Sequence, residues 1–282
     1  MALSVNESTA SRAEKLRIFV RVAVFLLFVW AGRMVFPALI GTSTDPLVAS
    51  ALSVFATSVL ANAVVVRGWE QGRLADLGLA WSNVSGRQLL TGLGLGAGAT
   101  ASVLGALLLF QVASYEEAEP TTSWKLLPLV IVVLALGAMG EELLFHGYAF
   151  QQLARQFGDF GVVLPVGVLF GVAHLQNNNV GAWAVVNTIA WGILLGFAWV
   201  RTRSLWLSIG LHFGWNLAAP FAGVNLSGFT MRMTGYQLNW RPGSWLSGGA
   251  YGLEGSAFTV AVVMLLGFVL YRITSEEITI ES

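Results

Sequence analysis

Long apolar stretches constrain this sequence more than any other feature. Each is close to the length that a bilayer-spanning helix requires, about 20 residues. They lie at roughly 17–40, 47–66, 88–113, 125–150, 161–176, 182–200, 204–221 and 257–272. Only 11% of the residues are charged, whereas soluble domains carry about 25%, so the chain cannot cover itself with a water-facing surface. The sequence therefore predicts an all-α fold, a polytopic transmembrane bundle of about eight helices that forms one membrane-embedded domain over residues 1–282.

Charge and cysteine content exclude several classes of function. The formal net charge is zero, so nothing in the bulk electrostatics predicts a nucleic-acid partner. The chain contains no cysteine, which removes disulfides, thiolate catalysis and cysteine–zinc sites. Membrane lipids are the one partner that composition alone predicts, and the oligomeric state is not readable from it.

The basic residues indicate an orientation in the membrane. If the amino terminus is cytoplasmic and eight spans alternate, eleven of the fifteen basic residues face the cytoplasm, as the positive-inside rule requires. These are Arg12, Lys15, Arg17, Arg21, Arg67, Arg73, Arg87, Arg155, Arg201, Arg203 and Arg272. Both termini are then predicted inside. The excess of 13 Arg over 2 Lys favours a GC-rich prokaryote and hence a prokaryotic plasma membrane.

Ionisable residues inside the apolar segments are the second informative feature. The three histidines of the chain, His146, His174 and His212, all lie within or at the edge of predicted spans. Glu141 and Glu142, in the fourth predicted span, are the only carboxylates well inside one. Charged groups are costly in a bilayer, so this grouping on three segments invites a functional explanation.

Helical spacing predicts how these side chains are arranged. Glu142 and His146 are four residues apart and share a helical face, and His212 and Asn216 repeat that interval. Glu141 is rotated by about 100° from Glu142, so the two glutamates are not expected to face the same partner.

Structural explanations stand beside the functional ones. A single intramembrane His or Asn is often only a helix–helix hydrogen-bond partner, and Glu142 with His146 could be a structural pair. Asn62, Asn187 and Thr188 are assigned to packing, with Asn187 as a weak candidate for supporting the site. Taken together, two carboxylates and histidines from other helices suit acid–base chemistry, metal binding or a proton-coupled transporter. Transporters often contain internal repeats, and none is found in this sequence.

Three short motifs lie on these segments: Glu141-Glu142-Leu-Leu-Phe-His146, Phe170-Gly-Val-Ala-His174 and His212-Phe-Gly-Trp-Asn216. They resemble, in that order, the EExxxR, FxxxH and HxxxN/D motifs of the CAAX protease and bacteriocin-processing (CPBP/Abi) family of intramembrane proteases. The motifs occur in the family's order within about 125–221, on hydrophobic segments.

The resemblance implies an intramembrane endopeptidase with a peptide or protein substrate. In that reading Glu141 is the general base and holds a water with His174, while His212 and Asn216 stabilise the oxyanion. Glu142 and His146 fix the helix that carries Glu141. The family has been described both as metalloproteases and as glutamate-dependent enzymes. Glu141, His174 and His212 are a ligand set that zinc or another divalent metal accepts, but no tightly bound cofactor is expected.

One departure from the family's pattern leaves an alternative open. The first motif usually ends in Arg, a fixed bidentate cation, where this chain has His146, which titrates. The alternative function is therefore a non-catalytic membrane-binding, immunity or regulatory scaffold of the same family. The substrate is not readable. A prokaryotic source would favour signal or bacteriocin peptides over prenylated proteins.

The predicted depths of the site residues disagree with one another. With strict alternation of eight spans, His174 falls near the outer end of the short fifth span, whereas Glu141 and His212 fall nearer the middle of theirs. A half-sunk cavity, or a tilted or broken fifth helix, would bring the three side chains together.

Overall fold

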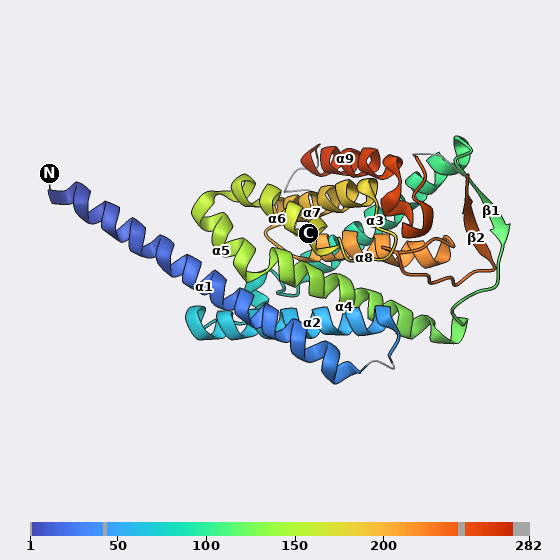
Figure 1. The fold of residues 1–282 in the computed structure, drawn as a ribbon. Coiled ribbons are helices and arrows are strands. Elements are labelled where there is room, and N and C mark those ends of the chain that lie inside the picture. The colour runs from blue at the N-terminus through green and yellow to red at the C-terminus, as the bar shows by residue number, and fades with distance from the viewer. Residues whose placement is uncertain (1, 42–43, 242–245, 273–282) are drawn as a thin grey trace.

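The computed structural model describes residues 2–41, 44–241 and 246–272, which fold into a bundle of nine α-helices with one small sheet. The predicted all-α transmembrane bundle is confirmed as a mostly helical fold (Figure 1). Its helices are α1 (Ala2–Ile40), α2 (Pro46–Val65), α3 (Asn83–Leu109), α4 (Leu127–His146), α5 (Tyr148–Phe157), α6 (Asp159–Ala173), α7 (Ala182–Thr202), α8 (Trp206–Phe221) and α9 (Ala257–Arg272). Short helical turns are η1 (Val66–Glu70), η2 (Leu74–Leu77), η3 (Trp124–Leu126), η4 (Gly249–Tyr251) and η5 (Leu253–Gly255).

Each predicted span contains a helix, but the helices differ in length. Five apolar helical segments in the described ranges are long enough to cross a membrane: Glu14–Ile40, Pro46–Glu70, Asn83–Leu109, Trp124–Phe157 and Ala182–Thr202. The other three predicted spans are shorter helices, since α6 has 15 residues and α8 and α9 have 16 each. At about 1.5 Å per residue these rise only about 22–24 Å, less than the roughly 30 Å of a hydrocarbon core.

Connecting segments that were predicted to lie on one side of the membrane gather at one end of the bundle. At the end that carries α5, on the left of Figure 1, Tyr148 donates from its hydroxyl to Glu70 at 3.0 Å, and the Leu205 amide donates to the Gly78 carbonyl at 3.0 Å. At the opposite end, β1 (Ala113–Glu117) and β2 (Tyr236–Trp240) pair antiparallel. This sheet was not predicted, because its two strands lie more than a hundred residues apart in polar loops.

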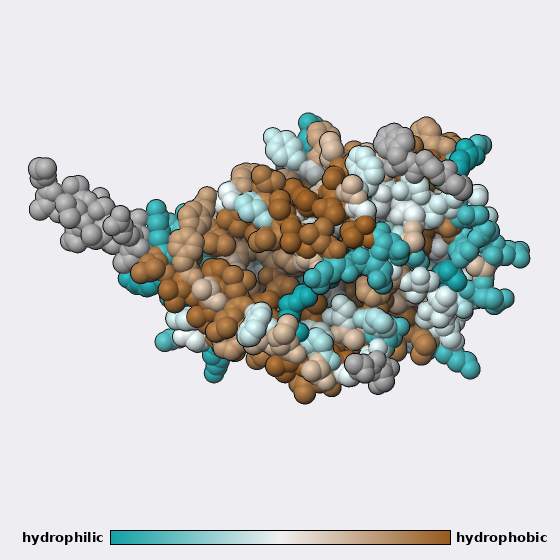
Figure 2. Space-filling model, in the orientation of Figure 1, coloured by the Kyte–Doolittle hydropathy of each residue, from teal (hydrophilic) through white to brown (hydrophobic). Residues whose placement is uncertain are grey.

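Apolar side chains cover much of the outside of the bundle, as a bilayer demands. Figure 2 shows hydrophobic residues over the middle of one face and hydrophilic residues gathered near the end that carries the sheet. Exposed large apolar side chains include Leu26, Leu27, Trp30, Leu164, Met264 and Phe268. Together with the five long apolar helices, this surface indicates an integral membrane protein.

Small residues let α3 and α8 pack with their backbones in close approach. A Cβ added at Gly92 would lie 2.5 Å from the Leu207 carbonyl oxygen, and one at Gly96 would lie 2.1 Å from that of Leu211. Gly92 and Gly96 are four residues apart on one face of α3. These two glycines therefore allow the close approach of α3 and α8. Gly94 and Gly98 of the same helix have no such role, because their Cβ positions meet nothing within 4 Å.

We expect Gly96→Ala to destabilise the protein by about 1–3 kcal/mol, because the new methyl group would overlap backbone atoms that cannot move independently. Gly98→Ala is the matched control, since it adds the same methyl group to the same helix in open space and improves helix propensity. Thermal unfolding of both variants in detergent tests this. Equal midpoints for the two variants would contradict the close packing of α3 on α8.

A side chain from α2 holds the break between α4 and α5. The segment 125–150 was predicted as one span, but α4 ends at His146 and Gly147 adopts a non-helical conformation (φ −76°, ψ −139°). The buried Asn62 donates from Nδ2 to the Leu143 carbonyl at 2.9 Å and accepts from the Tyr148 amide at 2.8 Å. It thereby satisfies backbone groups that the break leaves open. The assignment of Asn62 to packing is consistent with these contacts.

His174 lies directly after the short helix α6, at the start of an irregular segment. Because α6 ends at Ala173, His174 follows a helix too short to cross the bilayer, and irregular chain leads on to α7 at Ala182. Non-helical backbone at this depth is tolerated only where it is covered by protein or lines a cavity. The fifth predicted span is therefore one short helix followed by irregular chain, and the depth of the site stays a prediction.

Candidate functional site

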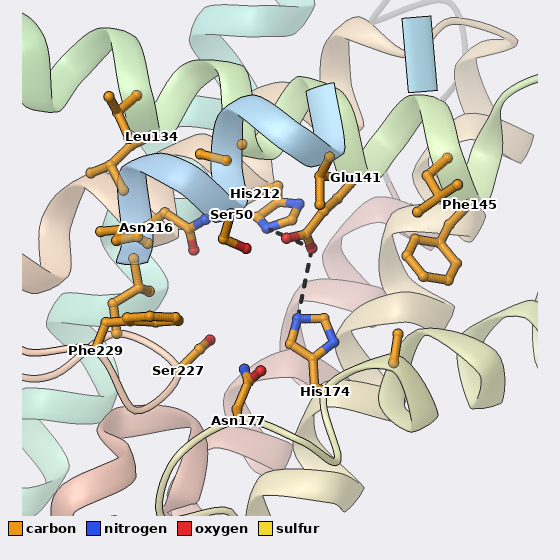
Figure 3. A pocket seen from close by; sticks show the side chains of 18 of the residues that line it. Ser50, Leu134, Glu141, Phe145, His174, Asn177, His212, Asn216, Ser227 and Phe229 are labelled. Atoms are coloured by element: carbon orange, nitrogen blue, oxygen red, sulfur yellow. Dashed lines mark ion pairs between the residues drawn. The ribbon is translucent and has the colours of Figure 1, made fainter. Parts of the chain in front are cut away.

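A cavity of about 230 Å³ lies between α2, α4, α8 and the irregular segments that follow α6 and α8. Figure 3 shows Glu141 and His212 on one side of it, with His174, Asn177 and Ser227 opposite. Its polar lining residues are Arg33, Ser50, Glu141, His174, Gln176, Asn177, His212, Asn216 and Ser227. Thus all four residues predicted to carry the chemistry, Glu141, His174, His212 and Asn216, line one cavity.

Glu141 presents to two imidazoles a carboxylate oxygen that forms no hydrogen bond. Its Oε2 atom is shielded from solvent and has no hydrogen-bond partner among the described residues. Oε2 lies 3.7 Å from Nε2 of His174 and 3.8 Å from Nε2 of His212. Both separations exceed a direct hydrogen bond, so the three atoms frame a position where a small polar molecule such as water can bind.

The backbone fixes the tautomer of His174. Nδ1 of His174 lies 2.8 Å from the Phe170 carbonyl oxygen, one turn earlier. A carbonyl only accepts, so Nδ1 carries the proton and donates. The neutral ring then has a free lone pair on Nε2, the nitrogen that faces Glu141, and can accept a hydrogen bond there.

Glu142 holds two histidines at once. Its carboxylate is fully buried, with Oε2 2.8 Å from Nδ1 of His146 and Oε1 2.9 Å from Nδ1 of His212. The predicted pairing of Glu142 with His146 across one turn is found in the structure. The expectation that Glu141 and Glu142 face different partners is wrong, because the two nitrogens of His212 lie on different sides of its ring, and Nδ1 meets Glu142 while Nε2 turns to Glu141.

His146 is fitted to a site that leaves little room for a longer side chain. It is fully buried, and a Cβ added at Gly196 of α7 would lie only 3.2 Å from its Nε2. Nε2 is enclosed without a hydrogen-bond partner in the described residues, which favours a neutral ring with its proton on Nδ1, donated to Glu142. The imidazole therefore meets the second glutamate at the position where the family's Arg is usual.

A second, smaller cavity of about 30 Å³ adjoins the first. The two share the side chains of His174, His212, Asn216 and Ser227. Glu254 in η5, which is only 6% exposed, also lines the smaller cavity. The sequence did not reveal Glu254, because it lies between the spans predicted at 204–221 and 257–272, and no hydropathy signal marks a loop glutamate as buried.

Glu254 is tied to the helices that carry the site. Its Oε1 atom accepts from Nε1 of Trp215 at 3.1 Å and from the Ser227 hydroxyl at 3.2 Å. From α7, Nδ2 of Asn187 donates to the backbone carbonyls of Glu254 and Ser256, both at 2.7 Å. Asn187 therefore supports the segment that carries Glu254, consistent with the weak assignment it received from sequence.

The fit of a metal ion is set by the same distances. Glu141, His174 and His212 are donors that zinc accepts, but ligands around tetrahedral zinc lie only about 3.3 Å apart when their bonds are about 2.0–2.1 Å long. The Nε2 to Oε2 separations of 3.7 and 3.8 Å are wider. Over residues 2–41, 44–241 and 246–272, no three His, Asp or Glu side chains are grouped to hold a metal ion. As arranged, the three residues are therefore too widely spaced for tetrahedral zinc.

Comparison with known proteins agrees with this geometry. Residues 123–218 match the family described as Type II CAAX prenyl endopeptidase Rce1-like. The chain contains an Rce1-like domain. This domain nearly coincides with the motif region expected at about 125–221, and it carries all three histidines together with Glu141, Glu142 and Asn216. Glu254 lies outside it.

One curated relative is similar to part of the chain. The chain is 31% identical over 91 residues to "Uncharacterized protein YyaK" of Bacillus subtilis (strain 168). That alignment covers 31% of this chain and 30% of the relative, so it spans less than a third of either protein.

Proposed function

We propose that this protein is an intramembrane endopeptidase that hydrolyses a peptide bond in the larger cavity, with a water activated by Glu141 and His174. The observation that carries the proposal is the shielded Oε2 of Glu141, which forms no hydrogen bond and faces Nε2 of two histidines at 3.7 and 3.8 Å. The Rce1-like domain supports it, because the family is one of prenyl endopeptidases.

In this mechanism the water is held by two acceptors. It donates one hydrogen bond to the carboxylate of Glu141 and the other to Nε2 of His174, whose own proton is on Nδ1. A lone pair of the water oxygen is then free to attack the carbonyl carbon of the substrate. As the new C–O bond forms, Glu141 takes a proton from the water.

The developing oxyanion needs hydrogen-bond donors that also line the cavity. Asn216 has an amide group for this, and it lines both cavities. Nδ1 of His212 donates to Glu142, so His212 can donate from Nε2 only as an imidazolium. Positively charged His212 and the amide of Asn216 stabilise the tetrahedral intermediate, and Glu141 then passes its proton to the leaving nitrogen as the C–N bond breaks.

The cavity wall indicates one property to vary in the substrate. Arg33 is the one Arg or Lys among the described residues that line the larger cavity, and it lies within the first long apolar helix. A cation at this place suits a carboxylate of a bound peptide, such as a free carboxyl terminus. We therefore include peptides with free and with amidated carboxyl termini in the experiment that tests the function.

The test is cleavage of a quenched fluorescent peptide library by the purified protein in detergent, with and without a chelator. A Glu141→Gln preparation serves as the blank for contaminating proteases. Cleavage by the wild type that persists with chelator supports water activation by Glu141 and His174, whereas cleavage lost with chelator supports a metal-dependent peptidase. If neither library nor membrane-protein substrates are cut, the non-catalytic scaffold, which the departure at His146 favours, replaces this proposal.

Asn216→Ala is expected to lower kcat by about 10²-fold with little change in KM, because an oxyanion donor acts mainly in the transition state. Steady-state kinetics on the best library peptide checks this. Asn177→Ala is the matched control, since Asn177 lines the same cavity but has no part in the proposed chemistry. A change confined to KM in Asn216→Ala would assign that residue to substrate binding instead.

The orientation remains a prediction, and its test requires the protein in sealed membrane vesicles or intact cells. We infer that the amino terminus and the end of the bundle with α5 face the cytoplasm, because most basic residues lie at that end. The cavity is lined in part by Asn177, Ser227 and Phe229, which belong to segments predicted on the opposite side. Since the chain has no native cysteine, single cysteines introduced at either end report their accessibility without background.

A further inference from the structure

Glu254 is a buried acid that the mechanism above does not use. Its side chain is 6% exposed, and its Oε1 atom is held by Nε1 of Trp215 and the hydroxyl of Ser227. Asn187 fixes the backbone of the same residue from α7. A carboxyl group in such surroundings is unfavourable as an unpaired anion, so its charge state must be coupled to a neighbour or to a bound proton.

The smaller cavity connects Glu254 with the wall of the candidate active site. Its volume is about 30 Å³, above the roughly 10–15 Å³ that a cavity needs to hold one water. The cavity is lined by His212, Asn216, Ser227 and Glu254, so a water there has several polar partners. One water bound there would lie between the carboxyl group of Glu254 and the side chain of His212, which lines both cavities.

His212 needs a proton that its own hydrogen bonds do not supply. Nδ1 donates to Oε1 of Glu142 at 2.9 Å, which leaves Nε2 without a proton in the neutral ring. To donate to an oxyanion, His212 must gain a second proton on Nε2. A nearby acid that can give up and take back a proton would meet this need within the protein.

Burial raises the pKa of Glu254 above that of an ordinary glutamate, so it keeps its proton to higher pH. Two other titratable groups line the cavity, His212 of α8 and His174 after α6, and Tyr251 of η4 faces Glu254. Glu141 and Glu142 lie on the other side of His212, which contacts both. Burial also raises the pKa of Tyr251, which therefore stays neutral. Nε2 of His174 is committed to the attacking water, which leaves His212 as the partner for proton exchange.

We propose that Glu254 stores the proton with which His212 stabilises the oxyanion. The proton passes from the carboxyl group of Glu254 to a water in the smaller cavity, and that water passes a proton to Nε2 of His212. The result is a carboxylate at Glu254 beside an imidazolium at His212, and the proton returns when the intermediate collapses. No heavy-atom bond changes. Glu254 does not touch the reacting atoms but acts through His212, and its catalytic use rests on the proposed function.

The test is an NMR titration of the full-length protein in detergent, labelled with ¹⁵N-histidine. The chain has only three histidines, so the ring signals can be assigned with His146→Gln and His174→Gln variants. In Glu254→Gln, we expect the His212 ring to lose its second proton at a pH about one unit lower than in the wild type, because the carboxylate that balances the imidazolium is gone. The side-chain oxygen of Gln still accepts from Trp215 and Ser227, so a purely structural role predicts no shift.

Two variants sharpen the comparison. Glu116→Gln is the matched control, since Glu116 is an exposed glutamate of β1 that also accepts from two side chains, Gln237 and Asn239. It should leave His212 unchanged. Glu254→Asp keeps an acid at the position, so the His212 titration should stay with the wild type. If Glu254→Gln fails to fold, Glu254→Asp decides, because a shift there of the size expected for loss of the acid would overturn the proposal.

Kinetics separate this inference from the proposed function. If the protein is a peptidase, the alkaline limb of kcat should move to lower pH in Glu254→Gln by the same amount as the His212 titration, with KM unchanged. A His212 shift without any peptidase activity would support proton exchange while the proposed function fails. An unshifted His212 signal in a folded Glu254→Gln protein would overturn the inference, whatever the activity.

Discussion

Glu141→Gln is expected to abolish peptide cleavage and leave the protein folded. The amide cannot take the proton of the attacking water, so kcat should fall by at least about 10³-fold, within the range attributed to a general base. The substitution keeps the size of the side chain. It disrupts no hydrogen bond at Oε2, which has no partner among the described residues. Single-turnover cleavage of the best library peptide, together with thermal unfolding of the same preparation, measures both effects.

The folded state of Glu141→Gln is what gives the kinetic result its meaning. A variant that retains the wild-type unfolding midpoint and still binds the peptide, as judged by fluorescence anisotropy, has lost chemistry alone. Cleavage at more than a tenth of the wild-type rate would exclude Glu141 as the base and leave the domain with a binding role. A variant that neither folds nor binds would contradict the geometry itself, in which Glu141 supports nothing else.

The sequence predicts where the helices lie but not where each of them ends or breaks. Hydropathy located every helix that surrounds the cavity, because burial in lipid requires long apolar runs. It could not show that α6 ends at Ala173 or that α4 breaks at Gly147, since a broken helix and a continuous one have the same hydropathy. The break depends on Asn62, a residue of α2 that lies more than eighty positions away.

The candidate site was predictable to the extent that it follows helical spacing. The pairing of Glu142 with His146 obeys the four-residue interval within one helix. The contact of His212 with both glutamates does not, because it depends on how α8 faces α4. Glu254 lay beyond prediction for a related reason. Its burial is produced by Trp215 and Asn187, and it lies outside the Rce1-like domain to which the family's motifs belong.

Glu142→Leu is expected to destabilise the protein by about 3–5 kcal/mol, the cost typical of removing one partner from a buried charged network. Leucine fits the volume but offers no acceptor. Nδ1 of His146 and Nδ1 of His212, which now donate at 2.8 and 2.9 Å, would both be left unpaired away from water. Because the two histidines belong to α4 and α8, the loss should loosen the contact between these helices as well. Unfolding in mixed micelles with increasing denaturing detergent measures the free energy.

The adjacent glutamate is the matched control for this loss of stability. Glu141→Leu makes the same change one residue earlier on the same helix, at a side chain that is 26% exposed and forms no hydrogen bond through Oε2. It should therefore leave the free energy of unfolding unchanged or slightly higher, as is common when a residue retained for chemistry is replaced. The two neighbouring glutamates would then have different roles, Glu141 in the reaction and Glu142 in the assembly of the site. Equal stability of the two leucine variants would mean that Glu142 does not hold His146 and His212.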